Sequence, residues 1–337
     1  MLAAWEDRYA DGVIALWNKE AVRDGYKELD ENTFKSIFTD NPYFDPRNAF
    51  VLLGREQEVA GFACGCTGDD LPLGDKAGYL TCIVLSGPYA LDENYKLLLT
   101  ALERRFAELG KTQADVLFFN PMQLPWYIPE TPGHEHNNAP GVPVGSRLHW
   151  FLLEQGYAER AREQAMYLDL SGFAVQEDIR AKEKAAAAAG YTVGVLGNMP
   201  AGDGRLSGFA PGGLRGIEEM LEGLGNPLWT KEIAACAANG TPVVFAAKNG
   251  LAAGFAGPVI RQPNGRGYFA GIGVHPDHEG HGLGTVLFFK LCEAFRAIGT
   301  PYMSLYTGVG NPAARIYGKA GFKAVKHFAV MRKELIR

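Results

Sequence analysis

Residues 275–284 read His-Pro-Asp-His-Glu-Gly-His-Gly-Leu-Gly, and they are the most informative part of the sequence. The segment before it, Tyr268-Phe-Ala-Gly-Ile-Gly-Val274, predicts a strand, and the apolar spacing over 285–297 predicts an amphipathic helix. The first turn of a helix leaves backbone N–H groups without partners and carries the positive end of the helix dipole, so a phosphate can bind there. Because the three glycines let the backbone approach such an anion, the sequence predicts a phosphate-binding turn between a strand and a helix.

Spacing excludes two common phosphate-binding motifs. A dinucleotide-binding G-x-G-x-x-G motif that began at Gly280 would need glycine at position 285, where the chain has Thr285. A Walker A loop requires Gly-Lys followed by Ser or Thr, and residues 275–284 contain no lysine. The turn therefore needs another phosphate ligand.

A second informative block lies downstream. A short strand is predicted over 303–307, and Asn311-Pro-Ala-Ala-Arg-Ile-Tyr-Gly-Lys-Ala-Gly-Phe322 follows it. Asn is a preferred N-cap residue of helices, and Gly often ends them. Asn311 and Gly321 are therefore expected to bracket a helix that carries Tyr317.

Together the two blocks resemble the GCN5-related N-acetyltransferase (GNAT) superfamily. Glu279-Gly-His-Gly-Leu-Gly284 is similar to its acyl-CoA pyrophosphate loop, Q/R-x-x-G-x-G/A, and the downstream block to its last conserved segment. The resemblance implies that acetyl-CoA is the co-substrate, that Tyr317 protonates the departing thiolate, and that Asn311 helps to place the pantetheine arm. A phenol with a pKa of about 10 is a suitable donor to a thiolate of comparable basicity. The resemblance also implies cofactor contacts at Ile272, Val274, Glu279, Gly280, His281, Gly282, Leu283, Gly284, Thr285, Asn311, Ala314 and Tyr317.

The loop departs from the family pattern at its first position. Glu279 stands where the superfamily has Gln or Arg, and a carboxylate that faced a pyrophosphate would repel it; the alternative is that Glu279 faces solvent. His281 is either a phosphate contact or an exposed loop histidine, and the sequence leaves both open. His275, His278 and His281 recur every three residues, but metal ligands usually come from separate elements, so no metal is expected.

The two halves of the chain show a similar order of predicted elements. In the first half, helices are predicted over 10–22, 31–39, 92–109 and 147–154, and strands over 49–53, 59–66, 78–85 and 115–119. In the second half, strands are predicted over 191–196, 243–247 and 252–260, and helices over 214–224 and 230–238, before the loop block.

The expected fold class is therefore α/β (α+β), with two tandem GNAT-like domains, each a mixed, mostly antiparallel central sheet flanked by helices. The N-terminal domain is expected over 1–172, with a Pro- and Gly-rich insertion at 120–146. Residues 173–190 are expected to be a linker, because 180–189 is rich in Ala and Lys, which favour helix whatever the function. The C-terminal domain, with the acetyl-CoA site, is expected over 191–337.

The two halves are not expected to be equally active. After Val84 the first half reads Leu-Ser-Gly-Pro-Tyr, with one glycine in the loop and with Pro88, which has no N–H donor. Leu152 stands four residues before Gly156, as Tyr317 stands before Gly321. The first half is therefore expected to lack coenzyme A chemistry and to serve as scaffold, as specificity half or as both. This resembles tandem members of the superfamily such as mycothiol synthase.

Composition bounds the partners and the compartment. The formal net charge of −5 over 337 residues argues against a broad nucleic-acid surface, and no segment is long and apolar enough to span a membrane. Five cysteines without framework spacing are typical of reduced thiols, so a cytoplasmic protein is expected. The expected oligomeric state is monomer or homodimer.

The resemblance predicts an N-acetyltransferase in which an amine of a small molecule or peptide attacks acetyl-CoA directly in a ternary complex. The general base remains unassigned, because Gly267–Val274 contains no carboxylate. The alternatives are a non-catalytic coenzyme A binding or sensing protein and a small-molecule binding protein that uses the aromatic insertion. The acceptor cannot be derived from fold and cofactor site.

Overall fold

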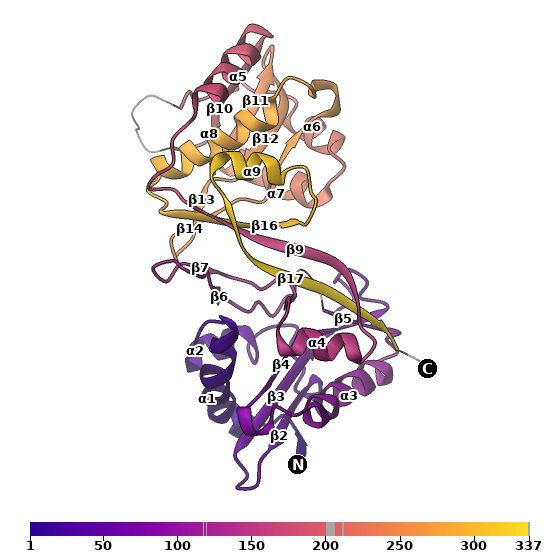
Figure 1. Ribbon diagram of the computed structural model, residues 1–337. Coiled ribbons are helices and arrows are strands. Elements are labelled where there is room, and N and C mark those ends of the chain that lie inside the picture. Colours follow the sequence, from indigo (N-terminus) through magenta and orange to yellow (C-terminus); the bar gives the residue numbers. More distant parts are fainter. Residues whose placement is uncertain (117, 119, 200–205, 211, 336–337) are drawn as a thin grey trace. The chain divides into compact units, whose positions relative to one another are not determined.

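The structure is a computed structural model that describes residues 1–116, 118, 120–199, 206–210 and 212–335. The chain forms two compact units (Figure 1). Unit 1 comprises Met1–Ala165 and Val325–Arg337, and unit 2 comprises Met166–Ala324. Both combine helices with mixed sheets, as the sequence predicts.

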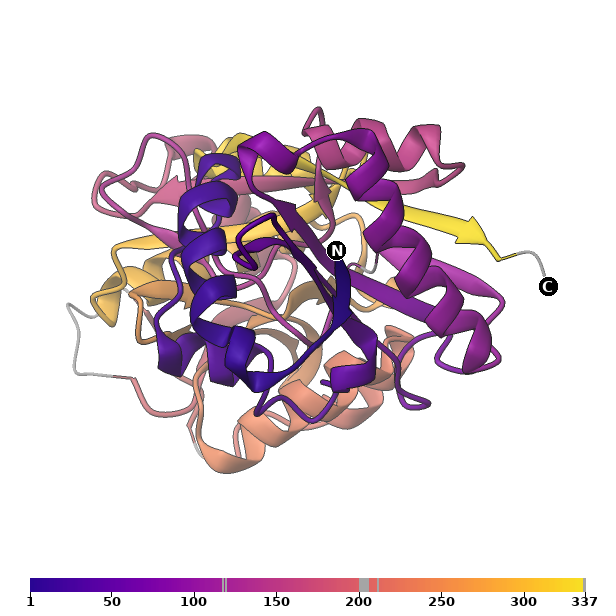
Figure 2. The same ribbon diagram turned by 90° about the horizontal axis from the view of Figure 1, so that it is seen from below.

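In unit 1 the strands follow the order β1-β2-β3-β4-β5-β17, antiparallel except for the parallel pair β4–β5. Figure 2 shows these strands between α1 on one side and α3 on the other. Side chains alternate between two cores: Phe62 and Cys64 of β3 join the core beneath α1, and Ala63 joins the core beneath α3. The elements are β1 Leu2–Ala4, α1 Ala10–Glu20, α2 Glu31–Ile37, β2 Ala49–Leu53, β3 Val59–Cys66, β4 Ala77–Leu85, α3 Asp92–Glu108, β5 Gln113–Val116, β6 Trp126–Tyr127, β7 Glu135–His136, β8 Val142–Pro143, α4 Arg147–Glu154, β9 Ala158–Asp169 and β17 Lys323–Glu334.

In unit 2 the antiparallel sheet β10-β11-β12-β15 packs on α8 with one face and on α6 and α7 with the other. A second group of strands, β13, β14 and β16, belongs to a separate sheet, in which β14 pairs with both β13 and β16. The elements are α5 Glu177–Ala188, β10 Tyr191–Leu196, α6 Ile217–Gly223, α7 Pro227–Asn239, β11 Val243–Lys248, β12 Leu251–Gly257, β13 Ile260–Arg261, β14 Arg266–Tyr268, β15 Gly271–Val274, α8 Leu283–Ala297, β16 Tyr302–Gly308 and α9 Ala314–Ala320.

The strand predicted over 268–274 is two strands with different partners. β14 pairs in parallel with β16, with Arg266 opposite Tyr302, whereas β15 pairs antiparallel with β12, with Gly271 opposite Gly257. The chain changes partner at residues 269–270, so β15 becomes the edge strand of its sheet. This branching leaves an open sheet edge next to the predicted phosphate turn.

The structure divides the chain differently from the sequence-based boundaries. Residues 166–172 belong to unit 2, because Leu168 and Leu170 lie in its core. The expected linker 173–190 contains α5, whose Ile179 and Ala186 are buried in that same core, so it is part of unit 2. Most of β17, the last strand of the expected C-terminal domain, belongs to unit 1.

That last strand completes the sheet of unit 1. β17 pairs with β5 over 331–334 and with β8 over 328–329. Arg332 adds a bidentate contact to Asp115, at 2.8 Å from Nη2 and 3.0 Å from Nε. The strand predicted over 115–119 ends at Val116 in the structure, and residues 117 and 119 lie outside the described residues.

Backbone hydrogen bonds establish the correspondence between the two units. Phe322 N donates to Tyr317 O, and Tyr157 N donates to Leu152 O, each at 3.0 Å, so Leu152 holds the position of Tyr317. His275 N donates to Ala253 O, and Ser86 N donates to Ala60 O. The counterpart of Val274 is therefore Leu85, one residue beyond the Val84 used in the sequence comparison.

The insertion 120–146 is packed rather than free, because Met122 and Trp126 are buried. All five cysteines are buried and free. In the described part of the chain, none of the helices combines the length and the hydrophobicity that a membrane span requires.

Candidate functional site

The glycine-rich turn links the end of β15 to the start of α8. After Val274 the chain makes a 3-10 turn at Pro276–His278 and then enters the left-handed region at Gly280 (φ +81°) and Gly282 (φ +71°). Gly282 is the N-cap of α8. A residue with a Cβ is strained at such φ values, which explains glycine at these two positions.

The first turn of α8 is open toward this turn. No side chain caps the helix, and its first turn contains no acidic residue. The N–H groups of Leu283, Gly284 and Thr285 have no acceptor among the described residues. The Leu283 side chain is buried in the core, so Leu283 contributes only its backbone. Three amides at the positive end of a 15-residue helix are suited to an anion.

The predicted site elements meet at Gly284. A Cβ placed on Gly284 would lie 3.7 Å from Ile316 Cδ1 on α9 and 3.9 Å from Val274 Cγ2 on β15. These are ordinary contact distances, so packing does not require glycine here. They show that loop, strand and downstream helix converge.

The open edge of β15 exposes alternate backbone groups. Because His275 N donates to Ala253 O and hydrogen-bonded pairs alternate in an antiparallel ladder, Gly271 and Gly273 face β12. The N–H and C=O groups of Ile272 and Val274 therefore point to the open edge. An extended ligand could pair with them as another strand would.

Tyr317 lies on α9 against the helix that carries the turn. Its ring centroid is 4.9 Å from that of Phe288 on α8, and the residue is 7% exposed. The hydroxyl makes no hydrogen bond to the described residues. Burial raises the pKa of Tyr317 to about 12, so the hydroxyl keeps its proton at neutral pH.

Asn311 is not the N-cap of α9, contrary to the sequence-based expectation. The helix begins at Ala314 with Ala313 as N-cap, and Asn311 lies two residues before that N-cap, in the preceding turn. Its Oδ1 accepts from Ala313 N at 2.9 Å, because Asn forms such local turns readily. Gly321 (φ +99°) ends the helix as predicted.

The side chains around the turn do not form a metal site. Glu279 and His281 are exposed, and the described residues contain no group of three or more His, Cys, Asp or Glu that could hold a metal. His278 Nδ1 lies 3.0 Å from Tyr191 Oη, and the His281 ring lies 5.1 Å from the Tyr191 ring. Burial lowers the pKa of His278, so this imidazole is neutral at pH 7.

Lys182 on α5 is a candidate site residue that the sequence analysis missed. A Cβ placed on Gly282 would lie 4.0 Å from Lys182 Cδ, so the lysine stem reaches the turn. The Lys182 side chain has no carboxylate partner within the described residues. No local motif could reveal it, because the sequence presents 180–189 as a spacer.

Glu232 on α7 is a second missed candidate. Tyr268 at the end of β14 donates its hydroxyl to Glu232 Oε1 at 2.8 Å, and Trp229 Nε1 donates to Ala270 O at 3.1 Å. Two residues of α7 thus contact the point where β14 and β15 change partner. Glu232 thus brings a carboxylate close to Gly267–Val274, a segment whose own sequence contains none.

Comparison with known proteins shows which family the second unit resembles. Residues 218–322 match the family model described as Acetyltransferase (GNAT) family. Residues 218–322 of unit 2 are thus similar to this family. The match contains the glycine-rich turn, α8 and α9. No curated protein matches the chain.

Solved structures extend the GNAT fold to the whole chain. A fungal multi-domain GH3 beta-N-acetylglucosaminidase with a GCN5-related glucosamine N-acetyltransferase region aligns with TM-score 0.66 and 14% identity, over 99% of this chain and 38% of that chain. A GCN5-related N-acetyltransferase from Sphaerobacter thermophilus aligns with TM-score 0.61 and 15% identity, over 100% and 96%. A tandem GNAT protein from the clavulanic acid biosynthesis pathway aligns with TM-score 0.56 and 14% identity, over 100% and 99%. This likeness shows a tandem GNAT fold.

Unit 1 has the GNAT fold, but its loop and helix start differ in charge from those of unit 2. Glu20 Oε1 accepts from Gly87 N at 3.1 Å, so a carboxylate of the chain occupies the loop. Asp92 and Glu93 lie in the first turn of α3, where they would repel a phosphate. Leu152, in the position of Tyr317, is fully buried and carries no acid.

Proposed function

We propose that the chain is an acyl-CoA-dependent N-acyltransferase that transfers the acetyl group of acetyl-CoA to an amine of a small molecule or peptide. The observation that carries the proposal is the uncapped first turn of α8 behind Gly280 and Gly282, with Tyr317 on the adjoining helix. The family match supports acetyl transfer as the class of reaction. The free, buried cysteines are consistent with a cytoplasmic enzyme.

In this proposal acetyl-CoA binds along α8, β15 and α9. The pyrophosphate accepts from the amides of residues 283–285, and the pantetheine arm pairs with the open edge of β15 at Ile272 and Val274. The Lys182 ammonium adds a positive charge beside Gly282 and offsets the charge of the exposed Glu279. Ala314 and Asn311 lie at the start of α9, beside the same arm.

The transfer needs one proton acceptor and one proton donor. A neutral amine attacks the thioester carbonyl; the N–C bond forms and the C–S bond breaks. The amine proton passes to Glu232, with Tyr268 as relay, because the Tyr268 hydroxyl already donates to that carboxylate. The Tyr317 hydroxyl donates its proton to the departing thiolate.

The test is release of coenzyme A thiol from acetyl-CoA with a panel of amines: polyamines, aminoglycosides, amino acids and peptides. Turnover that depends on one of these amines supports the proposal. Binding of acetyl-CoA without turnover over the whole panel would replace it with the non-catalytic coenzyme A binding protein. Absence of acetyl-CoA binding would overturn both.

A further inference from the structure

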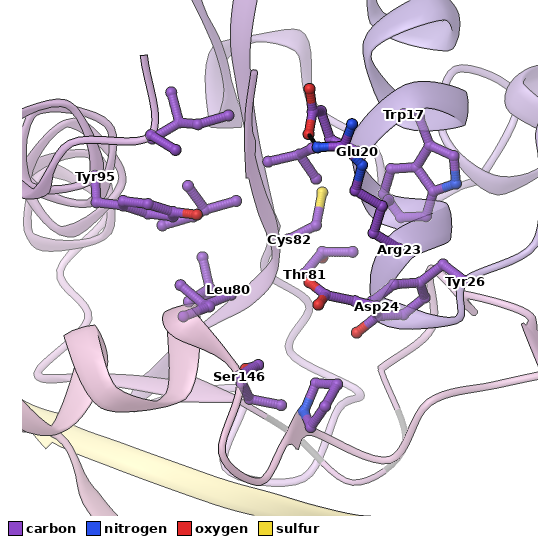
Figure 3. Close-up of a pocket in the computed structure, with 18 of the residues that line it drawn as sticks. Trp17, Glu20, Arg23, Asp24, Tyr26, Leu80, Thr81, Cys82, Tyr95 and Ser146 are labelled. Carbon is purple, nitrogen blue, oxygen red and sulfur yellow. Dashed lines mark hydrogen bonds and ion pairs between the residues drawn. The ribbon is translucent and has the colours of Figure 1, made fainter. Parts of the chain in front are cut away.

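A cavity of about 270 Å³ lies in unit 1, beside the strand that corresponds to β15 (Figure 3). β4 forms its back wall, with α1 and the turn after it on one side and α3 on the other. Apolar side chains line part of it, among them Leu80, Val142 and Leu148. The volume is near the lower end of the range for small-molecule sites, about 300–1,000 Å³.

The cavity exists because β4 and β5 separate. The two strands pair only over Ala77–Tyr79 and Gln113–Asp115. From there to Leu85, β4 pairs with β3 on one side and has no strand partner among the described residues on the side of β5. Because Ser86 N donates to Ala60 O, the alternation of the ladder directs the backbone groups of Ile83 and Leu85 away from β3. Unit 1 therefore keeps the branched sheet edge that unit 2 has at β15.

This cavity is not suited to a coenzyme A phosphate. The Glu20 carboxylate accepts from Gly87 N, and Asp92 and Glu93 stand at the start of α3. Pro88 removes a further N–H from the loop. The occupant of the cavity is therefore a molecule without a pyrophosphate.

Three polar side chains of the cavity have no hydrogen-bond partner among the described residues: Asp24, Tyr26 and Tyr95. Tyr95 is 7% exposed, and Figure 3 shows its hydroxyl end pointing from α3 toward β4. Asp24 and Tyr26 point into the cavity from the opposite side. Because these polar groups have no partner in the described part of the chain, a ligand in the cavity could hydrogen-bond to them in place of water.

The Asp24 carboxylate has no ion pair within the lining, whereas Glu20 and Arg23 form an ion pair at 2.7 Å and neutralise each other. Lys326 lies close: its Nζ donates to the backbone oxygen of Asp24, it lies over the rings of Trp126 and Phe328, and its charge lowers the pKa of the Asp24 carboxyl. Desolvation has the larger effect and raises that pKa, although Asp24 keeps an exposed surface. A ligand cation would therefore add to the charge of Lys326 in stabilising the ionised carboxylate.

We propose that this cavity is a second binding site of the protein, for a small primary amine with an apolar body. The ammonium group binds the Asp24 carboxylate and a tyrosine hydroxyl, and the apolar body packs against Leu80, Val142 and Leu148. The site is independent of acetyl-CoA, so its test stands whether or not unit 2 binds that molecule.

The test is calorimetric titration of the full chain with three matched probes: phenethylamine, 2-phenylethanol and phenylacetate. We expect the amine to bind at least about tenfold more tightly than the neutral alcohol, because an ion pair forms. Asp24→Asn should remove this difference in affinity. Tyr95→Phe, which keeps the ring packing with Phe151, should weaken binding of the amine about fivefold. Asp40→Asn, which removes a carboxylate exposed elsewhere in unit 1, should change nothing.

Two results would overturn the proposal. The first is binding of the alcohol or of phenylacetate as tightly as the amine. The second is amine binding that Asp24→Asn leaves unchanged while the variant unfolds like the parent. Retention of amine binding in a Gly282→Asp chain supports the independence of the two sites, and its loss would contradict it.

Discussion

The backbone N–H of Gly87 donates a hydrogen bond to Glu20 Oε1 at 3.1 Å. Unit 1 thereby has a carboxylate of its own in the loop after β4, whereas in unit 2 the loop after β15 leads to a first turn of α8 that contains no acidic residue. The two units thus differ in the charge near this loop: unit 1 has carboxylates there, and the first turn of α8 in unit 2 has none.

This relationship predicts the effect of Glu20→Ala. The substitution removes the acceptor of Gly87 and the partner of Arg23, so the free energy of unfolding should fall by about 1–2 kcal/mol in urea denaturation. Glu20→Gln retains a hydrogen-bond acceptor, so its free energy of unfolding should fall by less. Neither variant should gain an acetyl-CoA site, because Asp92 and Glu93 remain. A second acetyl-CoA site in Glu20→Ala would contradict this account of unit 1.

Lys182→Ala should raise the Kd of acetyl-CoA about threefold to tenfold, because it removes a partly exposed positive charge beside Gly282. The difference in Kd between parent and variant should become smaller as the salt concentration is raised. Lys184→Ala, on the same helix but exposed, is the matched control and should leave the Kd unchanged. Equal effects of the two substitutions would mean that Lys182 acts only through net charge.

Tyr317→Phe should lower kcat about a hundredfold with little change in acetyl-CoA affinity, because it removes the proton donor and keeps the packing on Phe288. Burial raises the pKa of Tyr317 to about 12, so the hydroxyl stays protonated below that pH. The ratio of parent to variant kcat should therefore be constant between about pH 7 and pH 10. A ratio that falls toward one by pH 10 would show a donor of ordinary pKa instead.

Glu232→Gln should lower kcat and move the acidic limb of its pH profile, since the proposed proton acceptor is lost. The amide can still accept from Tyr268, so the fold should be retained. Circular dichroism and acetyl-CoA affinity serve as controls. If kcat falls and the pH profile keeps its shape, Glu232 only positions Tyr268.

The sequence predicted the local features of the site well. The glycine-rich turn lies between a strand and a helix as expected, Gly321 ends α9, and Leu152 corresponds to Tyr317. These features depend on a few neighbouring residues, and local patterns reveal them. The N-cap assignment of Asn311 was wrong because its side chain closes a turn before the helix, a choice that spacing alone does not fix.

Features that depend on distant segments could not be predicted. The expected linker is buried because Ile179 and Ala186 meet the core of unit 2, and an Ala- and Lys-rich stretch gives little sign of that. The last strand joins unit 1 through pairing with β5, more than 200 residues away. Lys182 and Glu232 reach the site only through tertiary packing.

The central claim is that unit 2 alone binds acetyl-CoA, at the first turn of α8. Calorimetric titration of the full chain with acetyl-CoA tests it most directly. We expect one site per chain. It should be lost in Gly282→Asp, which adds strain and a negative charge at φ +71°, and kept in Gly110→Asp, which does the same at φ +76° in unit 1. No binding in the parent chain, or equal binding in both variants, would contradict it.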